Sequence, residues 1–214
     1  MARLSILARR LNSPVPGLAP LILMTDTERL ADPEIAVDSM PQGSVVILRH
    51  YGAEGRLALS RRLSALCRRH RLKLLIAADA RLAAALGADG VHLPEAMALQ
   101  GPGAWRRWRR PGWIVTAAAH SPAALFGAAR AGADAALLGP VFHTASHPDA
   151  RPIGVPRFTA WCRLSPIPVY ALGGISTATA PRLAASGAVG FAAIGAWRPP
   201  PRRRPVRPGV ATPT

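Results

Sequence analysis

Residues 168–196 read PVYALGGISTATAPRLAASGAVGFAAIGA. An apolar run at Pro168–Leu172 ends in a pair of glycines, and a second run at Val189–Ile194 begins shortly after another glycine. The stretch between them, Thr177–Ser186, is rich in Ala and has the spacing typical of a helix. The segment therefore predicts strand, helix, strand, which is the repeating unit of a parallel sheet.

The same order recurs along the rest of the chain. Three related phrases, Gly87-Ala-Asp89, Gly132-Ala-Asp134 and Gly187-Ala-Val189, each end a predicted helix just before a strand. The predicted strands are Leu21–Thr25, Val45–Arg49, Lys73–Ala77, Gly90–Leu93, Trp113–Ala117, Ala135–Gly139, Pro168–Leu172 and Val189–Ile194, and the other predicted helices are Glu54–His70, Ala80–Leu86, Pro122–Ala131 and Pro156–Arg163. Eight strands with helices between them predict a single α/β domain, a (β/α)8 TIM barrel with its active site at the C-terminal ends of the strands.

The two ends of the chain differ from this pattern. We expect residues 1–20 to be a lead-in and residues 21–197 to form the barrel. Residues 198–214 are rich in Pro and Arg, and proline cannot propagate a helix. The eighth helix is therefore expected to be missing or replaced by a disordered tail.

Composition narrows the function classes. No apolar run approaches the roughly 18 to 20 uncharged residues of a membrane span, so we expect a soluble, cytoplasmic protein with no membrane partner. Cys67 and Cys162 are the two cysteines and form no metal-binding motif, so helix packing is their expected role. The net charge is +16, but the arginines are not interleaved with aromatic residues in a nucleic-acid motif, and we do not expect a nucleic-acid partner.

Glycines at the ends of the last two strands predict a phosphate site. Gly173 and Gly174 follow strand seven, and Gly195 follows strand eight. Glycine lets the backbone approach a ligand closely, and the loops after these two strands are the usual phosphate site of the fold. A plain turn is the alternative for the Gly-Gly pair.

Several motifs occur in the order and spacing of one family. They are Asp89-Gly-Val-His-Leu93, Ala119-His-Ser121, Gly139-Pro-Val-Phe-His-Thr-Ala-Ser-His147, Pro168-Val-Tyr-Ala-Leu-Gly-Gly-Ile175 and Gly187-Ala-Val-Gly190. In these motifs the chain resembles the thiamine phosphate synthases, a family that also contains a thiazole tautomerase. The resemblance is densest over residues 73–197.

The resemblance implies a role for individual residues. Gly173, Gly174 and the backbone near Gly195 would hold the phosphate of a thiazole phosphate, beside the hydroxyl groups of Thr144 and Ser146. Arg49 would contact the diphosphate of a pyrimidine substrate, with His50 next to it, and Asp79 would bind Mg2+.

Four positions depart from the synthase pattern. Arg-x-Lys is here Arg49-His-Tyr51, Asn-Asp is Ala78-Asp79, and the lysine after strand six is His147. We expect His147 to bind substrate there and to replace part of the lost positive charge. The second magnesium aspartate is replaced within Pro94-Glu-Ala-Met97, where Met97 takes its position. Synthase chemistry needs cations around a diphosphate leaving group. The changes alter two lysine positions and one aspartate ligand of Mg2+, so the metal site is incomplete unless Glu95 substitutes as a ligand.

Three readings therefore stay open. The first is the synthase, which couples thiazole phosphate to a pyrimidine diphosphate with Mg2+. The second is the tautomerase, which needs no metal and would use His120 as its acid/base, because histidine titrates near neutrality. The third is a non-catalytic phosphate-binding homologue. His92 is expected to be structural, and Asp79 is either a magnesium ligand or a helix cap. A homodimer is left open.

Overall fold

Eight parallel strands pair in sequence order and close into a barrel. The structure is a computed structural model, and it describes residues 4, 6–8, 15–30, 32–52, 54–144 and 150–194. The strands are β1 (Leu21–Met24), β2 (Val45–Leu48), β3 (Lys73–Ala77), β4 (Gly90–Leu93), β5 (Ile114–Ala119), β6 (Ala135–Leu138), β7 (Val169–Leu172) and β8 (Gly190–Ala193). Each overlaps a predicted strand, and the predicted fold class is confirmed.

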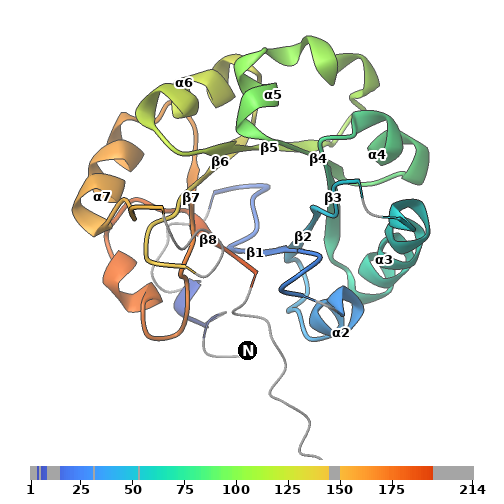
Figure 1. The fold of residues 1–214 in the computed structure, drawn as a ribbon, viewed down its shortest axis with the longest axis horizontal. Coiled ribbons are helices and arrows are strands. Elements are labelled where there is room, and N and C mark those ends of the chain that lie inside the picture. Colours follow the sequence, from blue (N-terminus) through green and yellow to red (C-terminus); the bar gives the residue numbers. More distant parts are fainter. Residues whose placement is uncertain are drawn as a thin grey trace, which may run out of the picture.

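Helices surround the barrel on its outer side (Figure 1). The α-helices are α2 (Pro33–Asp38), α3 (Arg56–His70), α4 (Ala80–Leu86), α5 (Glu95–Leu99), α6 (Pro122–Arg130) and α7 (Val155–Leu164), and the 3-10 helices are η1 (Pro102–Ala104), η2 (Arg106–Trp108) and η3 (Ala180–Leu183). Four α-helices match predicted ones, whereas α2 and α5 are too short to produce a clear helical period.

The helix predicted at Thr177–Ser186 is wrong. Only η3 forms there. The N–H of Ser176 donates to Thr179 Oγ1 (2.9 Å) and the N–H of Thr179 donates to Ser176 Oγ (3.2 Å), a reciprocal pair that caps the first turn of the segment. Pro181 then lacks an N–H, and Ala185 adopts a left-handed φ of 58°.

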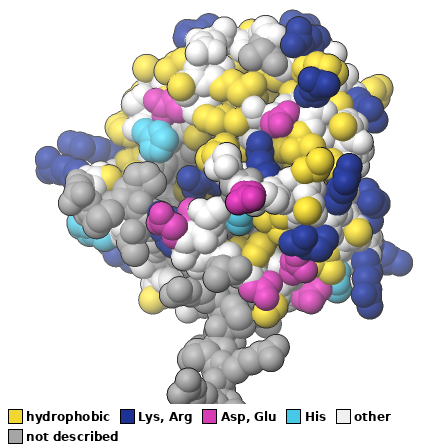
Figure 2. Space-filling model, turned by 45° about the vertical axis from the view of Figure 1, so that its right-hand side comes forward, with side chains coloured by type: hydrophobic (Ala, Val, Ile, Leu, Met, Phe, Trp, Pro, Cys, Tyr) yellow, Lys and Arg dark blue, Asp and Glu magenta, His cyan; other side chains and the backbone are white. Residues whose placement is uncertain are grey.

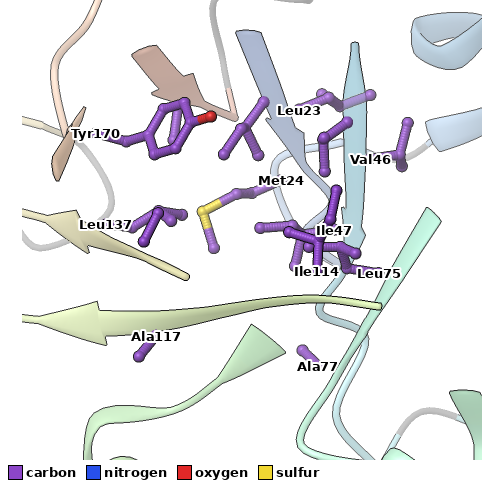
Figure 3. Packing of buried hydrophobic residues seen from close by; sticks show 14 of the residues in the cluster. Leu23, Met24, Val46, Ile47, Leu75, Ala77, Ile114, Ala117, Leu137 and Tyr170 are labelled. Atoms are coloured by element: carbon purple, nitrogen blue, oxygen red, sulfur yellow. The ribbon is translucent and has the colours of Figure 1, made fainter. Parts of the chain in front are cut away.

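The core fills the barrel and the layer beneath the helices. All four residues of β1 and all four of β2 are buried, because the barrel interior covers one face of each strand and the outer layer the other. Figure 3 shows Met24, Leu137 and Tyr170 from different strands meeting in this cluster. Burial on both faces explains why the strands read as continuous apolar runs.

The barrel closes between β8 and β1, where Leu21 lies opposite Phe191. The buried Tyr170 hydroxyl donates to the carbonyl of Ala19 at 2.6 Å, which ties β7 to the segment before β1. Because β8 pairs with β1, no open sheet edge remains among the described strands, and the eight C-terminal strand ends form one continuous rim.

Arginine side chains crowd parts of the surface, including the right-hand side of Figure 2. In and beside η2, Arg107 stacks on Trp108 at 5.3 Å and Arg109 stacks on Trp105 at 5.8 Å, measured to the ring centroids. No helix in the described part of the chain has the length and apolarity to cross a membrane. The predicted tail, residues 198–214, lies outside the described residues, as does the position of an eighth helix.

Candidate functional site

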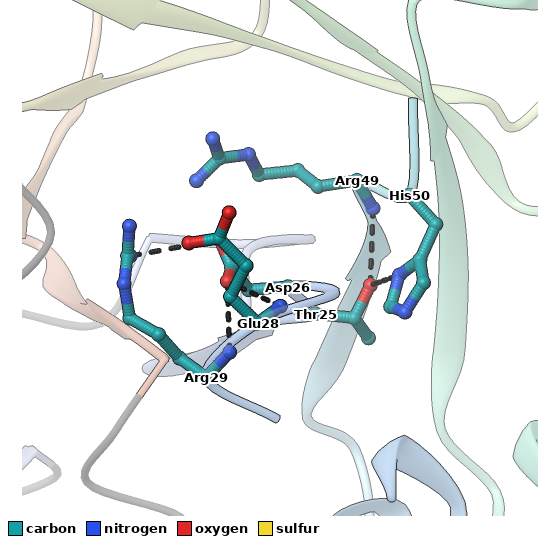
Figure 4. A network of polar contacts seen from close by, with 6 residues as sticks. All are labelled: Thr25, Asp26, Glu28, Arg29, Arg49 and His50. Carbon is teal, nitrogen blue, oxygen red and sulfur yellow. Dashed lines mark hydrogen bonds and ion pairs between the residues drawn. The ribbon is translucent and has the colours of Figure 1, made fainter. Parts of the chain in front are cut away.

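A cluster of polar groups lies where β1 and β2 end (Figure 4). Thr25 Oγ1 accepts the backbone N–H of Arg49 at 3.1 Å and lies 2.9 Å from His50 Nδ1. His50 is 8% exposed, and burial lowers its pKa, an effect that Asp26 opposes and Arg56 reinforces. His50 is therefore neutral near pH 7, and its Nδ1 atom faces Thr25.

Arg49 is the half-buried cation of this cluster. Its guanidinium carbon lies 5.9 Å from the ring centroid of Tyr51. Burial raises the pKa of Tyr51, and the positive charges of Arg49 and Arg56 oppose that shift. In Figure 4 the Arg49 side chain extends from the end of β2 toward the turn that contains Asp26 and Arg29. The Arg49 guanidinium thus adds a positive charge beside the ion pair of Arg29 and Asp26, whose Nη1 and Oδ2 atoms are 3.5 Å apart.

Asp79 follows β3 and caps α4. Its Oδ1 accepts the backbone N–H of Leu82 at 2.8 Å, and its Oδ2 lies 3.7 Å from Nη1 of Arg56. Nη2 of Arg56 donates to the carbonyl of Ala77 at 2.6 Å, which holds the guanidinium at the end of β3. Both oxygens of Asp79 therefore already have a partner within the chain.

The donor set at this rim does not fit Mg2+. Magnesium takes oxygen ligands in near-octahedral geometry, usually with one or two carboxylates. Asp79 is engaged by Leu82 and Arg56, the second predicted ligand position is the thioether of Met97, and Glu95 is bonded to His120. Within the described residues, no three His, Cys, Asp or Glu side chains are grouped to hold a metal.

Glu95 and His120 meet between β4 and β5. Glu95 Oε2 accepts the backbone N–H of His120 at 2.8 Å and lies 2.6 Å from its Nδ1. His120 directly follows β5, and Glu95 is the first residue of α5. The His120 side chain is 54% exposed and the Glu95 side chain 29% exposed, so the pair is open to solvent at the rim.

The loops after β6 and β7 pack tightly against each other. Gly173 and Gly174 both have positive φ, at 91° and 65°. A Cβ on Gly173 would lie 2.6 Å from Pro140 Cα, and a Cβ on Gly174 would lie 2.5 Å from the carbonyl oxygen of His143. Only glycine fits this close approach, which brings the β7 loop beside the segment that leads to Thr144.

Three consecutive backbone N–H groups in the β7 loop have no acceptor in the described part of the chain: those of Gly173, Gly174 and Ile175. The carbonyl groups next to them are engaged, since Gly173 O accepts from Phe142 N (3.2 Å) and Gly174 O accepts from Thr179 Oγ1 (2.8 Å). The loop is therefore held in place while these three donors have no partner among the residues that the structure describes.

Other predicted residues fall outside the rim cluster or outside the described chain. Thr144 is half-buried at the end of the β6 loop, whereas Ser146, His147 and Gly195 lie outside the described residues. His92 is buried with Nδ1 2.9 Å from Thr116 Oγ1, in agreement with a structural role. Burial also raises the pKa of the Cys67 and Cys162 thiols to about 12, so both are unreactive packing residues near neutral pH.

The sequence analysis missed the partners of the predicted residues. It did not identify Arg56 as the cation beside Asp79, or Glu95 as the partner of His120. Arg182 was also missed, and its guanidinium lies 5.1 Å from the ring centroid of Phe142, the residue against which Gly174 packs. The charge complementarity of Glu95 and His120, each at a strand end, was the one available signal.

Comparison with known proteins identifies the family. The sequence profile of the family described as thiamine monophosphate synthase matches residues 21–197, from β1 through β8. A thiamine-phosphate synthase of Chlorobium phaeobacteroides is 31% identical over 186 residues, which are 85% of this chain and 89% of that protein. A Synechococcus thiamine-phosphate synthase is 32% identical over 191 residues, 83% of this chain, and the chain spans about half (52%) of that protein's length.

A solved structure supports the same fold. Thiamine phosphate pyrophosphorylase from Pyrococcus furiosus aligns with a TM-score of 0.62 and 24% identity, covering 88% of this chain and 87% of that one. The family profile covers the whole barrel, so the resemblance seen in the sequence motifs is confirmed. This chain belongs to the thiamine monophosphate synthase family, whose members act in thiamine biosynthesis.

Proposed function

We propose that this chain binds a thiazole phosphate at the β7 loop and couples the thiazole to a pyrimidine diphosphate. The observation that carries the proposal is the row of N–H groups at Gly173, Gly174 and Ile175, which have no acceptor among the described residues. Successive N–H groups on a glycine-containing turn form a concave anion site. In this fold the loop after strand seven is also where phosphate commonly binds.

The phosphate end of the substrate would be held mainly by backbone groups. Thr144 is at the end of the adjacent β6 loop and adds a hydroxyl group that can donate to a phosphate oxygen. Gly195 stays a proposed contact in the loop after β8, and Ser146 a proposed contact after β6. Backbone recognition of this kind selects an anion without requiring a lysine.

Coupling would take place toward the Arg49 end of the rim. The pyrimidine's carbon–oxygen bond to diphosphate breaks, and the thiazole nitrogen supplies the electron pair for the new carbon–nitrogen bond. Negative charge grows on the departing diphosphate, and the guanidinium of Arg49 is placed to stabilise it. We assign no step to a metal, because Asp79 and Met97 do not form a fitting donor set.

A direct assay tests this proposal. The full-length protein is incubated with thiazole phosphate and pyrimidine diphosphate, and thiamine phosphate is measured by chromatography. We expect product with and without magnesium, and a roughly 10²- to 10³-fold loss of kcat in Arg49→Ala, in line with removal of one electrostatic donor. Absence of thiamine phosphate under both conditions would exclude the coupling reaction.

A second candidate reaction is favoured by the contact between Glu95 and His120. A thiazole tautomerase moves one proton between two atoms of a thiazole carboxylate phosphate and needs neither metal nor diphosphate. His120 lies at the C-terminal rim of the barrel with a carboxylate on Nδ1, an arrangement that general acid–base catalysis uses. The same phosphate site would serve either substrate.

Supplying the thiazole tautomer alone separates the two reactions. Proton NMR follows its conversion, and His120→Ala is expected to lower kcat by roughly 10²- to 10⁴-fold if His120 is the acid/base. Conversion that is unchanged in this variant would remove His120 from the mechanism. A protein that binds thiazole phosphate but performs neither reaction would be the non-catalytic homologue.

A further inference from the structure

The contact between Glu95 and His120 is more specific than a surface ion pair. One oxygen, Oε2, receives both the backbone N–H and the side-chain Nδ1 of the same histidine, at 2.8 and 2.6 Å. We propose that Glu95 is a positioning residue that holds the His120 imidazole in a single tautomer, with its proton on Nδ1. The proposal rests on the second candidate reaction, in which His120 transfers the proton.

The tautomer follows from the donors and acceptors involved. An ionised carboxylate can only accept hydrogen bonds, so the ring nitrogen that faces it must carry the proton. With the ring neutral and Nδ1 protonated, Nε2 keeps its lone pair and is the basic atom. No other hydrogen bond to the His120 ring occurs within the described residues, so Nε2 stays available to a substrate.

The orientation of the ring is also restricted. The backbone donor is the N–H of His120, which directly follows β5, so its position is set by the barrel rather than by the side chain. The carboxylate is anchored at this backbone group and then binds the ring of the same residue. The two bonds therefore constrain the imidazole relative to its own main chain, which a lone contact to the ring would not do.

Such a constraint suits a proton-transfer reaction. Nε2 would accept a proton from one atom of the thiazole system, and the resulting imidazolium would return a proton to another atom, with no net change in the enzyme. A histidine that samples both tautomers would present the correct one for part of the time only. The gain from Glu95 is therefore expected in kcat rather than in substrate binding.

Nuclear magnetic resonance measures the tautomer without any substrate. Full-length protein labelled with 15N-histidine gives long-range 1H–15N spectra that separate Nδ1-protonated from Nε2-protonated rings. We expect His120 to be protonated on Nδ1 in the unmodified protein and to move toward the Nε2-protonated form in Glu95→Ala. Glu95→Gln retains an amide oxygen that can accept, so it is expected to be intermediate.

The chain supplies matched controls. His70 Nε2 lies 3.0 Å from Asp38 Oδ1, so a neutral His70 ring is expected to carry its proton on Nε2 in the same spectrum, whereas that of His120 is on Nδ1. Glu34→Ala removes a carboxylate from another exposed ion pair, with Arg62 at 2.6 Å, and is expected to leave the His120 signals unchanged. Thermal unfolding of each variant shows whether the fold is retained.

The kinetic test is separate from the spectroscopic one. With the thiazole tautomer as substrate, Glu95→Ala is expected to lower kcat by roughly 10- to 100-fold while KM changes little, and Glu95→Gln to recover part of the loss. An identical His120 tautomer with and without the Glu95 carboxylate would overturn the positioning role. If the tautomer changes as expected but the unmodified protein does not convert the substrate, the proposed reaction is wrong and its failure is seen independently.

Discussion

At the scale of single residues, Asp79 has a structural role at a position where the family resemblance implies a magnesium ligand. One carboxylate oxygen caps α4 through Leu82 and the other faces Arg56, so the side chain stabilises local structure at the end of β3. An aspartate N-cap has a free-energy contribution of about 1 kcal/mol. This role accounts for the residue without a metal.

Replacing Asp79 should therefore reduce stability in a manner that another cap restores. Asp79→Ala is expected to lower the free energy of unfolding by about 1 kcal/mol, and Asp79→Ser, which can still accept from Leu82, by less. Urea unfolding followed by circular dichroism measures both. Equal losses in the two variants would mean that the contact with Arg56, rather than capping, is the stabilising interaction.

A second residue, His92, predicts how stability depends on pH. Its side chain is buried against Thr116, and burial, reinforced by the charge of Arg49, lowers its pKa from 6.5 to about 3. Between these values the unfolded chain binds a proton at His92 that the folded chain does not, so protonation favours unfolding. The contribution of His92 is complete above pH 6.5 and is lost as pH falls toward 3.

Urea unfolding at pH 7.5 and at pH 5 tests this dependence. The free energy of unfolding should be lower at pH 5, and His92→Gln should show a smaller difference between the two conditions because it cannot be protonated. The half-buried His70 provides the control, since His70→Gln leaves His92 in place and should retain the pH dependence that His92 supplies. An undiminished pH dependence in His92→Gln would show that other groups, such as His50, are responsible.

At the scale of elements, the close packing of the β6 and β7 loops can be separated from backbone strain. Gly173 and Gly43 both have positive φ, at 91° and 79°. A Cβ on Gly43 meets nothing within 4 Å, whereas one on Gly173 would lie 2.6 Å from both Cα and Cβ of Pro140. An alanine would therefore be strained by the positive φ at both positions, but its Cβ would clash only at position 173.

Gly43→Ala is expected to cost about 1 to 2 kcal/mol, the strain of a left-handed residue. Gly173→Ala should cost more, because the β7 loop must move away from Pro140, and it should also weaken phosphate binding. Chemical unfolding gives the first comparison and calorimetric titration with thiazole phosphate gives the second. Equal costs would mean that the loop gives way easily and that the glycine is not needed for packing.

Elements also show where sequence patterns succeed and where they fail. The eight strands were predictable because their residues are almost all buried and mostly apolar, as in β1 and β2, so each forms a short run ending near a glycine or a polar residue. The segment Thr177–Ser186 was not, because its Ala-rich spacing favours a helix, whereas Pro181 has no N–H for the helical hydrogen bond and Ala185 adopts a left-handed φ of 58°. Backbone constraints at these two residues therefore outweighed the periodicity.

At the scale of the whole molecule, barrel closure decides which distant residues meet. The sequence predicted that Arg49, Asp79, His120 and Gly173 would gather at one rim, because parallel strands place their C-terminal ends together. It did not predict the contact of Glu95 with His120, which are 25 residues apart, or that of Arg56 with Asp79. Such pairings depend on side-chain geometry that exists only once the barrel has formed.

At the scale of the whole molecule, a ligand bound at the closed rim should stabilise the entire barrel. A ligand that binds only the folded state at 100 times its dissociation constant stabilises it by about 2.7 kcal/mol, which corresponds to a rise in melting temperature of about 5 to 10 °C for a domain of this size. Thiazole phosphate is expected to produce such a rise through the unpaired N–H groups of Gly173, Gly174 and Ile175. Differential scanning calorimetry measures it.

Magnesium chloride alone should behave differently from thiazole phosphate in the same experiment. Because Asp79 is engaged by Leu82 and Arg56 and Met97 offers no oxygen, the metal should raise the melting temperature no more than sodium chloride of equal ionic strength. A rise specific to magnesium that disappears in Asp79→Ser would contradict this reading, since the carboxylate would then have to leave Arg56 to bind the ion. The phosphate half of the site and the metal half are thus tested by separate ligands on one folded protein.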